Sequence, residues 1–201
     1  MTTITKAKLT FDQFIDNYPD DGKFYELVNG ESVEMRATRN HDDVADFIAD
    51  SFKDEIKRLN LNYVVKNTVV IKTVTEDGIE QGRKPDVSVI NRDVWRTNRS
   101  AYAALDEPIQ LAVEVTSTNW EDDYVDKFDE YQRLGILEYW IVDYLAIGGR
   151  KYLGKPKIPS VFIYILNQQK EYNVSQFRGN EKIVSLTFPE LFLTAEQILN
   201  A

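Results

Sequence analysis

Apolar and polar residues alternate early in the chain and then recur at helical spacing. Two alternating runs, 24–28 and 32–35, flank Asn29-Gly30, which is the strongest short-range signal for a β-hairpin. Apolar residues spaced three and four positions apart then predict a helix from about 40 to 59. The first sixty residues therefore predict a hairpin followed by one long amphipathic helix.

The middle of the chain is predicted as strands joined by one crossover helix. Residues 63–74 are rich in valine and isoleucine and form one expected strand that is split by Lys66-Asn67. Further apolar runs follow at 86–90 and 109–116. The helix is expected over 119–134, because acidic residues in its first turn suit the helix dipole and a glycine follows its last turn. A fully buried strand is expected at 137–142.

The last part of the chain predicts a second hairpin. A loop containing glycine and proline covers 145–159, and the strands 160–166 and 170–177 follow it. A further strand is expected at 182–186, and short helical segments between 189 and 199. This order of elements predicts an α/β (α+β) fold with a mixed sheet flanked by helices, an N-terminal hairpin and a C-terminal hairpin.

The composition is that of an ordinary globular protein. The 201 residues suit a single domain, 1–201, with its core at about 10–195, and 43% of them are hydrophobic. No apolar run is long enough to span a bilayer, and residues 1–9 lack the apolar stretch of a signal peptide. Together with the absence of cysteine, this predicts a cytoplasmic protein that does not enter a membrane.

The net charge narrows the possible partners. A charge of -9 and a pI of about 4.8 argue against broad non-specific binding to nucleic acid, which depends on neutralising phosphates. A local basic groove in an otherwise acidic protein is still compatible with this charge.

The sequence also limits the kind of metal that the chain could bind. Cysteine is absent and His41 is the single histidine, so thiolate sites and histidine-rich zinc sites are excluded. Any metal must be a hard cation held by oxygen atoms, such as Mg²⁺ or Mn²⁺.

Two carboxylates occupy strands that are otherwise apolar. Glu114 lies inside the run 111–115, and Asp86 begins the preceding strand. An ionised carboxylate in a buried strand needs a partner or a metal. If the two strands pair, the carboxylates can converge and favour a divalent cation between them, which would polarise a phosphoryl oxygen.

Two polar residues on the predicted crossover helix point to the same chemistry. Lys127 and Tyr131 are four positions apart, so they share one face of that helix. If this face is turned toward the sheet, the Lys127 ammonium would stabilise the negative charge that builds up on a phosphate during cleavage.

The order of these residues resembles the PD-(D/E)XK signature of the restriction-endonuclease-like superfamily, with Pro85-Asp86 followed by Glu114-Val115-Thr116. A longer series of blocks is similar to the putative restriction endonuclease family that is abundant in cyanobacteria. These blocks are Tyr25-Glu26-Leu27-Val28-Asn29-Gly30-Glu31, His41, Glu114-Val115-Thr116-Ser117, Lys127, Tyr131, Gly135-Ile136 and Glu138-Tyr139-Trp140-Ile141-Val142-Asp143. The short fragments are weak signals alone, whereas the ordered series over roughly 10–195 is specific.

The resemblance implies a restriction-endonuclease-like core, with a central mixed sheet flanked by helices. It also implies cleavage of DNA phosphodiester bonds with Mg²⁺ or Mn²⁺ as the cofactor. Asp86 would be the motif aspartate and Glu114 the second acidic metal ligand, with the Val115 carbonyl as a third. Asp86, Glu114 and Lys127 would form the catalytic set.

The chain departs from the family pattern at one position. The motif lysine is expected at position 116, where this sequence has Thr116. The resemblance implies that the lysine has moved to the following helix, so Lys127 is its substitute. Glu26 would replace the acid that an early element contributes in many members of the superfamily. His41, Tyr131 and Thr116 are expected to support the site.

Each assignment has a simpler structural alternative. Asp86 could cap a turn at the start of its strand, and Glu114 could be an ion-paired structural acid. Glu26 could lie on the surface of its hairpin, His41 could simply begin a helix, and Tyr131 could serve packing.

Lys127 has its own alternative, since acidic residues surround it on its helix. A solvated helix face with ion pairs at three- and four-residue spacing would explain the pattern equally well. The acidic residues concerned are Asp123, Asp126, Asp129 and Glu130. At the end of the next strand, Asp143 is expected to be a turn residue.

Two functions follow from these expectations. The first is a metal-dependent DNA endonuclease, which we expect to be a homodimer because cutting both strands usually requires two active sites. The alternative is a catalytically weak or inactive DNA-binding or regulatory protein on the same scaffold. Thr116 and the acidic charge favour the alternative. A purely structural module would leave the paired buried acids unexplained.

Overall fold

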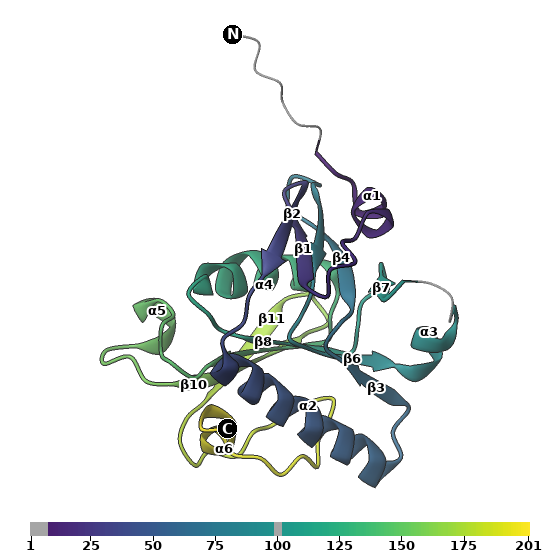
Figure 1. The fold of residues 1–201 in the computed structure, drawn as a ribbon. Helices are drawn as coiled ribbons and strands as arrows, with labels where there is room; N and C mark the ends of the chain where they lie inside the picture. The colour runs from purple at the N-terminus through teal and green to yellow at the C-terminus, as the bar shows by residue number, and fades with distance from the viewer. Residues whose placement is uncertain (1–7, 99–101) are drawn as a thin grey trace.

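A computed structural model describes residues 8–98 and 102–201, in which helices flank two β-sheets (Figure 1). In chain order the elements are α1 (Phe11–Asp16), β1 (Phe24–Val28), β2 (Glu31–Met35), α2 (Arg39–Leu59), β3 (Tyr63–Lys66), β4 (Val70–Val74), β5 (Glu80–Arg83), β6 (Val87–Asn91), α3 (Arg92–Arg96), β7 (Ala104–Leu105), β8 (Leu111–Val115), η1 (Asp122–Asp126), α4 (Lys127–Leu134), β9 (Glu138–Asp143), α5 (Arg150–Leu153), β10 (Ser160–Leu166), β11 (Tyr172–Phe177) and α6 (Ala195–Leu199).

The smaller sheet is built on the predicted N-terminal hairpin. Strands β1 and β2 are antiparallel, and between them Asn29 and Gly30 have φ angles of 52° and 84°. Positive φ at both positions is the geometry of a tight hairpin turn, which Asn-Gly favours. The sheet continues in the order β2-β1-β5-β4-β7.

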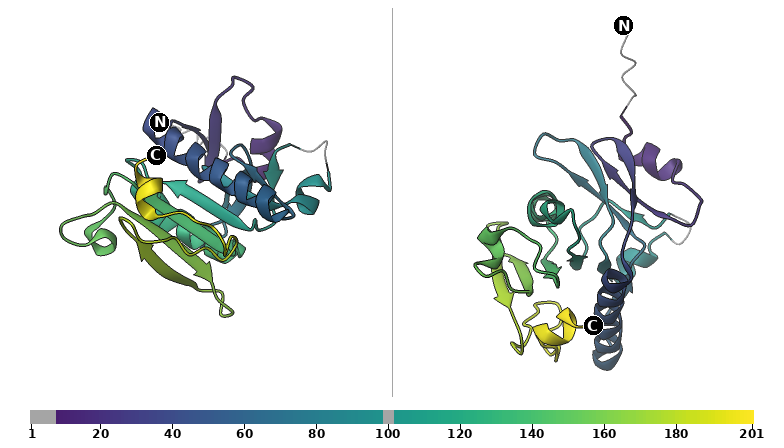
Figure 2. Two further views of the ribbon diagram at one scale, coloured as in Figure 1. Left: turned by 90° about the horizontal axis from the view of Figure 1, so that it is seen from below. Right: turned by 60° about the vertical axis from the view of Figure 1, so that its left-hand side comes forward.

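The larger sheet has the order β11-β10-β9-β8-β6-β3. Strands β8 and β9 are parallel, and the other neighbouring pairs are antiparallel. The predicted mixed sheet and the C-terminal hairpin, β10 with β11, are thus confirmed. The two views in Figure 2 show this sheet and the smaller one as separate layers.

Helices cover both faces of the larger sheet, with α2 below it and α4 above it in Figure 1. Side chains of a strand alternate between faces, so β9 contributes to two buried clusters. Trp140 and Val142 join the cluster on the α2 face, whereas Tyr139 and Ile141 join the cluster on the α4 face. This is why β9 is buried along its whole length, as the sequence predicts.

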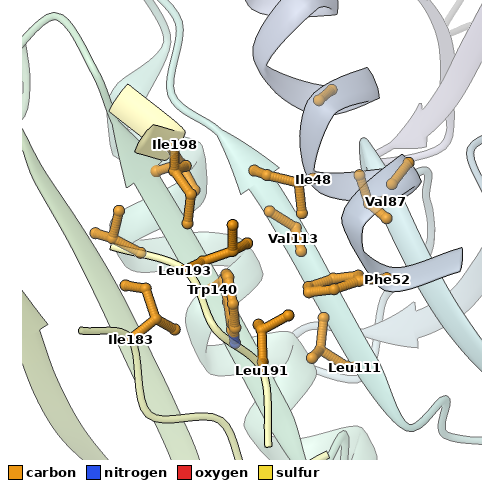
Figure 3. Close-up of a cluster of buried hydrophobic side chains, with 14 of the residues drawn as sticks. Ile48, Phe52, Val87, Leu111, Val113, Trp140, Ile183, Leu191, Leu193 and Ile198 are labelled. Atoms are coloured by element: carbon orange, nitrogen blue, oxygen red, sulfur yellow. The ribbon is translucent and has the colours of Figure 1, made fainter. Parts of the chain in front are cut away.

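Figure 3 shows part of the hydrophobic cluster on the α2 face. Ile48 and Phe52 project from α2 at four-residue spacing, as the sequence pattern predicts. The Phe52 ring meets the Trp140 ring edge to face, with 5.2 Å between the centroids, and stacks on Phe188. Burying each such side chain contributes about 1.5–3 kcal/mol to stability.

The expected strand 63–74 is two strands that belong to different sheets. Residues 63–66 pair with β6 in the larger sheet, while 70–74 pair with β5 in the smaller one. The chain therefore crosses between the sheets immediately after Lys66. The crossover helix also differs from a simple α-helix, since it begins with a π-helical segment, η1, before α4.

The predictions for the end of the chain are partly wrong. The segment 182–186 is not a strand, because its ladder consists of a single bridge between Lys182 and Thr194. Residues 189–190 form a turn and 191–192 have no regular structure, so the expected helical segment there is absent, and the closing helix is α6. Among the described residues, no helix has the length and apolar character that crossing a bilayer requires.

Candidate active site

A cleft of about 280 Å³ lies where the hairpin, the start of α2 and the ends of β6 and β8 come together. Its charged and histidine side chains are Arg36, His41, Asp42, Asp46, Lys84, Asp86, Glu114, Asp123 and Lys127. The three residues predicted to be catalytic, Asp86, Glu114 and Lys127, all line this cleft.

Strand pairing brings the two predicted carboxylates together. Strands β6 and β8 are antiparallel with Val87 opposite Val113, so Asp86 and Glu114 come next on the two strands. Asp86 Oδ2 accepts a hydrogen bond from the Val115 N–H at 2.8 Å, and its side chain is 19% exposed. Glu114 is only 2% exposed. The predicted convergence is therefore present in the structure, with Asp86 at the opening and Glu114 deeper.

Lys127 is buried against this pair of acids. Its Nζ lies 2.9 Å from Glu114 Oε2, 3.4 Å from Glu26 Oε1 and 3.5 Å from Asp123 Oδ1. The side chain is 5% exposed, so the alternative of a solvated helix face is wrong for Lys127. The segment η1 immediately precedes Lys127, and π-helical turns of this kind occur frequently at functional sites.

Tyr131 holds the other oxygen of Glu114. Its hydroxyl donates to Glu114 Oε1 at 2.6 Å, and the side chain is fully buried. The face shared by Lys127 and Tyr131 is thus turned toward the larger sheet, as the four-residue spacing predicts. Both oxygens of Glu114 receive a donor from α4, which fixes the orientation of the carboxylate.

Glu26 enters the site from the smaller sheet. Its Oε1 accepts from the Lys84 N–H at 2.9 Å, and its Oε2 lies 3.5 Å from Arg83 NH1. Arg83 in turn binds Glu130 through two hydrogen bonds of 2.8 and 2.7 Å, and the Thr73 hydroxyl donates to the same carboxylate at 2.6 Å. Glu26 is therefore a buried member of the site, and a position on the hairpin surface is excluded.

His41 lies at the first turn of α2, where Thr38 caps its backbone N–H. Its Nε2 is 3.2 Å from Asp86 Oδ2, and its Nδ1 is 3.6 Å from Asp42 Oδ1. Burial lowers the pKa of His41, but the hydrogen bond and charge of Asp86 outweigh this and raise it. The histidine thus begins a helix and also contacts the site, so both expectations hold.

Thr116 and Asp143 have different environments from the catalytic set. Thr116 is fully buried, and within the described residues its Oγ1 has no hydrogen-bond partner. Asp143 ends β9 and accepts hydrogen bonds from the N–H groups of Ile147 and Gly148, which makes it the expected turn residue. Neither residue supplies a cation near Glu114, whereas Lys127 does.

The buried cluster carries more negative than positive charge. Its cations are Arg83 and Lys127, and His41 lies at its edge. Its carboxyl groups are Glu26, Asp86, Glu114, Asp123 and Glu130. Five acids with two permanent cations leave a formal excess of three negative charges.

The pKa values respond to this imbalance. Burial, with the charges of neighbouring carboxylates, raises the pKa of Glu114 to about 8 and that of Asp123 to about 7. Burial alone would lower the pKa of Lys127, but the carboxylates around it, led by Glu114, raise it well above its usual value. At neutral pH the lysine is therefore charged, and protons partly offset the excess of acid.

The donor atoms fit a hard divalent cation. Among the described residues, no three acidic or histidine side chains form a complete metal cage. Mg²⁺ is usually bound by only one or two carboxylates and keeps several waters, so Asp86 and Glu114 supply what it requires. Each carboxylate oxygen has two lone pairs, so Glu114 can accept from Lys127 and Tyr131 and still bind a cation.

Comparison with known proteins assigns the chain to a family. Residues 11–196 match Uma2, whose description is "Putative restriction endonuclease". The chain belongs to the Uma2 family. This confirms the resemblance that the ordered sequence blocks indicate.

A solved structure supports the fold of this Uma2 chain. It is described as a putative nuclease belonging to DUF820 from Anabaena variabilis ATCC 29413, and it has a TM-score of 0.69 at 15% sequence identity. The match covers 96% of this chain and 98% of that chain. The predicted restriction-endonuclease-like architecture is thus confirmed. No curated protein sequence matches the chain.

Three buried residues of the candidate site do not appear among the sequence-based candidates. Asp123 has a signal that could have found it, because it lies four residues before Lys127 and shares its helix face. Arg83 and Glu130 have no such local signal, since 47 positions separate them in the chain. Only the packing of the smaller sheet against α4 brings them together.

Proposed function

We propose that this chain is a Mg²⁺- or Mn²⁺-dependent endonuclease that hydrolyses phosphodiester bonds in DNA. Membership of the Uma2 family supports nuclease activity. The observation that carries the finer proposal is the 2.9 Å contact between Lys127 Nζ and Glu114 Oε2 beside Asp86 in one cleft. Two carboxylates and a buried lysine are the groups that metal-assisted cleavage of a phosphodiester needs.

The residues divide into those that hold the cation and those that act on the phosphate. Asp86, Glu114 and the Val115 carbonyl would hold the ion. The ion polarises a phosphoryl oxygen and makes water a stronger nucleophile. Tyr131 and the Val115 N–H keep Glu114 and Asp86 in place, because each donates to one of these carboxylates.

Lys127 would supply the positive charge that Thr116 cannot. Its raised pKa keeps the ammonium protonated at neutral pH, so it stabilises charge on the phosphate and does not act as a base. Its neighbours Glu26 and Asp123 provide it with further acceptors. The departure at position 116 is therefore compatible with catalysis.

Cleavage of plasmid DNA with and without Mg²⁺ or Mn²⁺ tests the proposal. The Lys127→Met variant should lose about 10²–10³-fold in single-turnover rate, as happens when a residue that stabilises transition-state charge is removed. Glu114→Gln should fall at least as far. The matched control is Glu138→Gln, which replaces a fully buried glutamate on the adjacent strand β9 that is held by the Trp140 and Thr187 N–H groups.

The control should retain wild-type cleavage once its fraction folded is accounted for. A wild-type protein that binds DNA but cuts none in any divalent metal would contradict the proposal. It would favour the alternative of an inactive DNA-binding protein on the same scaffold. Equal loss of activity in Glu138→Gln and Glu114→Gln would indicate a folding defect and would also remove support from the assigned roles.

We further propose that two copies of the chain act together on duplex DNA. One cleft of this kind cuts one strand, and paired sites in a symmetric dimer cut both. Sedimentation of the free protein should give the mass of a dimer, and plasmid cleavage should give linear product with little nicked intermediate. A monomer that only nicks plasmid DNA would contradict this.

A further inference from the structure

A second surface groove, of about 490 Å³, follows the free edge of the larger sheet. It is lined by the edge strand β3, by the last turns of α2 and by the start of α3. Its lining residues include four cations, Lys53, Lys57, Lys66 and Arg92, and no acidic residue. We call this surface the β3 groove. In a protein with a net charge of -9, a lining of this composition is unusual.

Most cations of the β3 groove are not neutralised by an acidic partner among the described residues. Lys53 pairs with Asp50 at 2.9 Å. Lys57, Lys66 and Arg92 make no ion pair with any described acid. By contrast, several other cations form ion pairs with acidic side chains, namely Lys23, Arg36, Arg58, Lys72, Arg83, Lys127 and Arg133. The groove therefore keeps positive charge that is free to meet an external anion.

The β3 groove leads into the proposed active site. Lys66, the last residue of β3, lines the groove, and the next residue, Asn67, lines the cleft that contains Asp86. Arg92 lies at the other end of β3, where its guanidinium donates to the Tyr63 carbonyl. Four residues of strand span about 10 Å, which is the axial rise of about three nucleotides. Figure 1 shows β3 at the edge of the sheet, beside α3 and the end of α2.

One aromatic ring lies beside this row of charges. The Lys66 ammonium lies 5.0 Å from the centre of the Trp95 ring, and both side chains are half-buried. A cationic groove flanked by an aromatic side chain is the combination that binds a nucleic-acid strand without reading its sequence.

We infer that the β3 groove binds the sugar-phosphate backbone of the DNA whose scissile bond enters the cleft. The inference rests on the proposed function for the identity of the ligand. Free cations at one edge of an acidic protein attract the polyanion locally, and each phosphate contact releases counterions.

Fluorescence anisotropy with a labelled DNA duplex in EDTA tests the inference, because binding is then measured without cleavage. The double variant Lys57→Gln/Lys66→Gln should bind about tenfold more weakly at low salt. The slope of log K against log salt concentration should become shallower by about 1.8, the value for two lost phosphate contacts on duplex DNA.

The matched control is Lys151→Gln/Lys170→Gln, which removes the same charge from exposed lysines of α5 and the β10–β11 turn. It should leave the affinity and the salt slope close to those of the wild type. Thermal unfolding checks that each variant is folded. The single variant Lys57→Gln, at an exposed helix position, provides a test if the double variant is unstable, with a slope change of about 0.9.

Unchanged binding in the β3 groove variants, or an equal loss in the control, would overturn the inference. The result is separable from the proposed function. DNA binding through the groove without any cleavage would support this inference and contradict the nuclease proposal. If the Lys57→Gln/Lys66→Gln variant binds DNA with wild-type affinity and cuts it, the nuclease proposal is supported and only the inference about the β3 groove is contradicted.

Discussion

Helices α2 and α4 cover opposite faces of the same sheet, but they are attached to it by different chemistry. The residues that α2 buries are mainly apolar, such as Val44, Ile48 and Phe52. The residues that α4 buries are Lys127, Glu130 and Tyr131, each with a polar group that must be satisfied. Polar burial adds little net stability compared with apolar burial of the same volume. The difference indicates that the α2 face maintains the fold, whereas the α4 face is arranged for chemistry.

The largest expected effect lies on the α2 face. Phe52→Ala removes a fully buried ring that contacts Trp140 and Phe188, so the free energy of unfolding should fall by about 4 kcal/mol. Urea denaturation measures this change. A loss below about 1 kcal/mol would show that the apolar face does not dominate stability.

Arg83 provides the corresponding test on the α4 face. Arg83→Met leaves Glu130 buried without its cation and removes one of the two cations beside Glu26, so stability should fall by about 3 kcal/mol. The double variant Arg83→Met/Glu130→Leu should recover most of that loss, because apolar residues can replace a buried ion pair. If the double variant is no more stable than the single one, the polar contacts themselves hold α4 in place. The two faces would then not differ in how they contribute to stability, contrary to our expectation.

The stability of the metal-free protein should depend on pH through the same face. Glu114 and Asp123, with pKa values raised to about 8 and 7, keep protons in the folded state that the unfolded chain releases near pH 4. Stability should therefore fall as pH rises from about 5 to 8, by up to about 1.4 kcal/mol per pH unit for each proton.

Chemical denaturation at several pH values in EDTA measures this slope. Glu114→Gln should flatten it, because the amide does not titrate. A free energy of unfolding that stays constant or rises over this range in the wild type would contradict the raised pKa values. The Glu138→Gln control should leave the slope unchanged.

The smallest effect is expected at Tyr131. Tyr131→Phe removes the hydroxyl that donates to Glu114 and keeps the packing of the ring. The free energy of unfolding should therefore fall by about 1–2 kcal/mol. DNA cleavage should fall less than in Lys127→Met, since Lys127 still holds the other oxygen. A loss of cleavage as large as that of Lys127→Met would mean that Tyr131 does more than orient the carboxylate.

Local patterns in the sequence are sufficient to predict much of this site. Asn29-Gly30 predicts the hairpin, and the position of Glu114 inside an apolar strand predicts a buried acid. The spacing of Lys127 and Tyr131 predicts that both residues face the same way. Each of these signals is a short-range consequence of strand or helix geometry, which is why the sequence contains it.

The remainder of the site depends on contacts between distant segments. Glu130 has the same local sequence context as a solvated helical acid, and its partner Arg83 reaches it only because β5 belongs to a second sheet. The sequence predicts one central sheet, and a strand over 63–74 that is split at Lys66-Asn67 but not divided between two sheets, so it contains no basis for this contact. The three unpaired cations of the β3 groove are likewise distributed over α2, β3 and α3.

The position of the proposed catalytic lysine on a helix has a consequence for how such sites can change over time. In the motif that this chain resembles, the acid and the lysine share one strand. Changing their spacing by one residue would turn one of the two side chains to the opposite face of the sheet. Here 13 positions separate Glu114 from Lys127, and they include a connecting segment outside any regular strand. Insertions in that segment would leave α4 and the sheet intact. Related chains can therefore differ in the length of this segment while conserving the site, and a search for a fixed acid-x-lysine pattern would miss them.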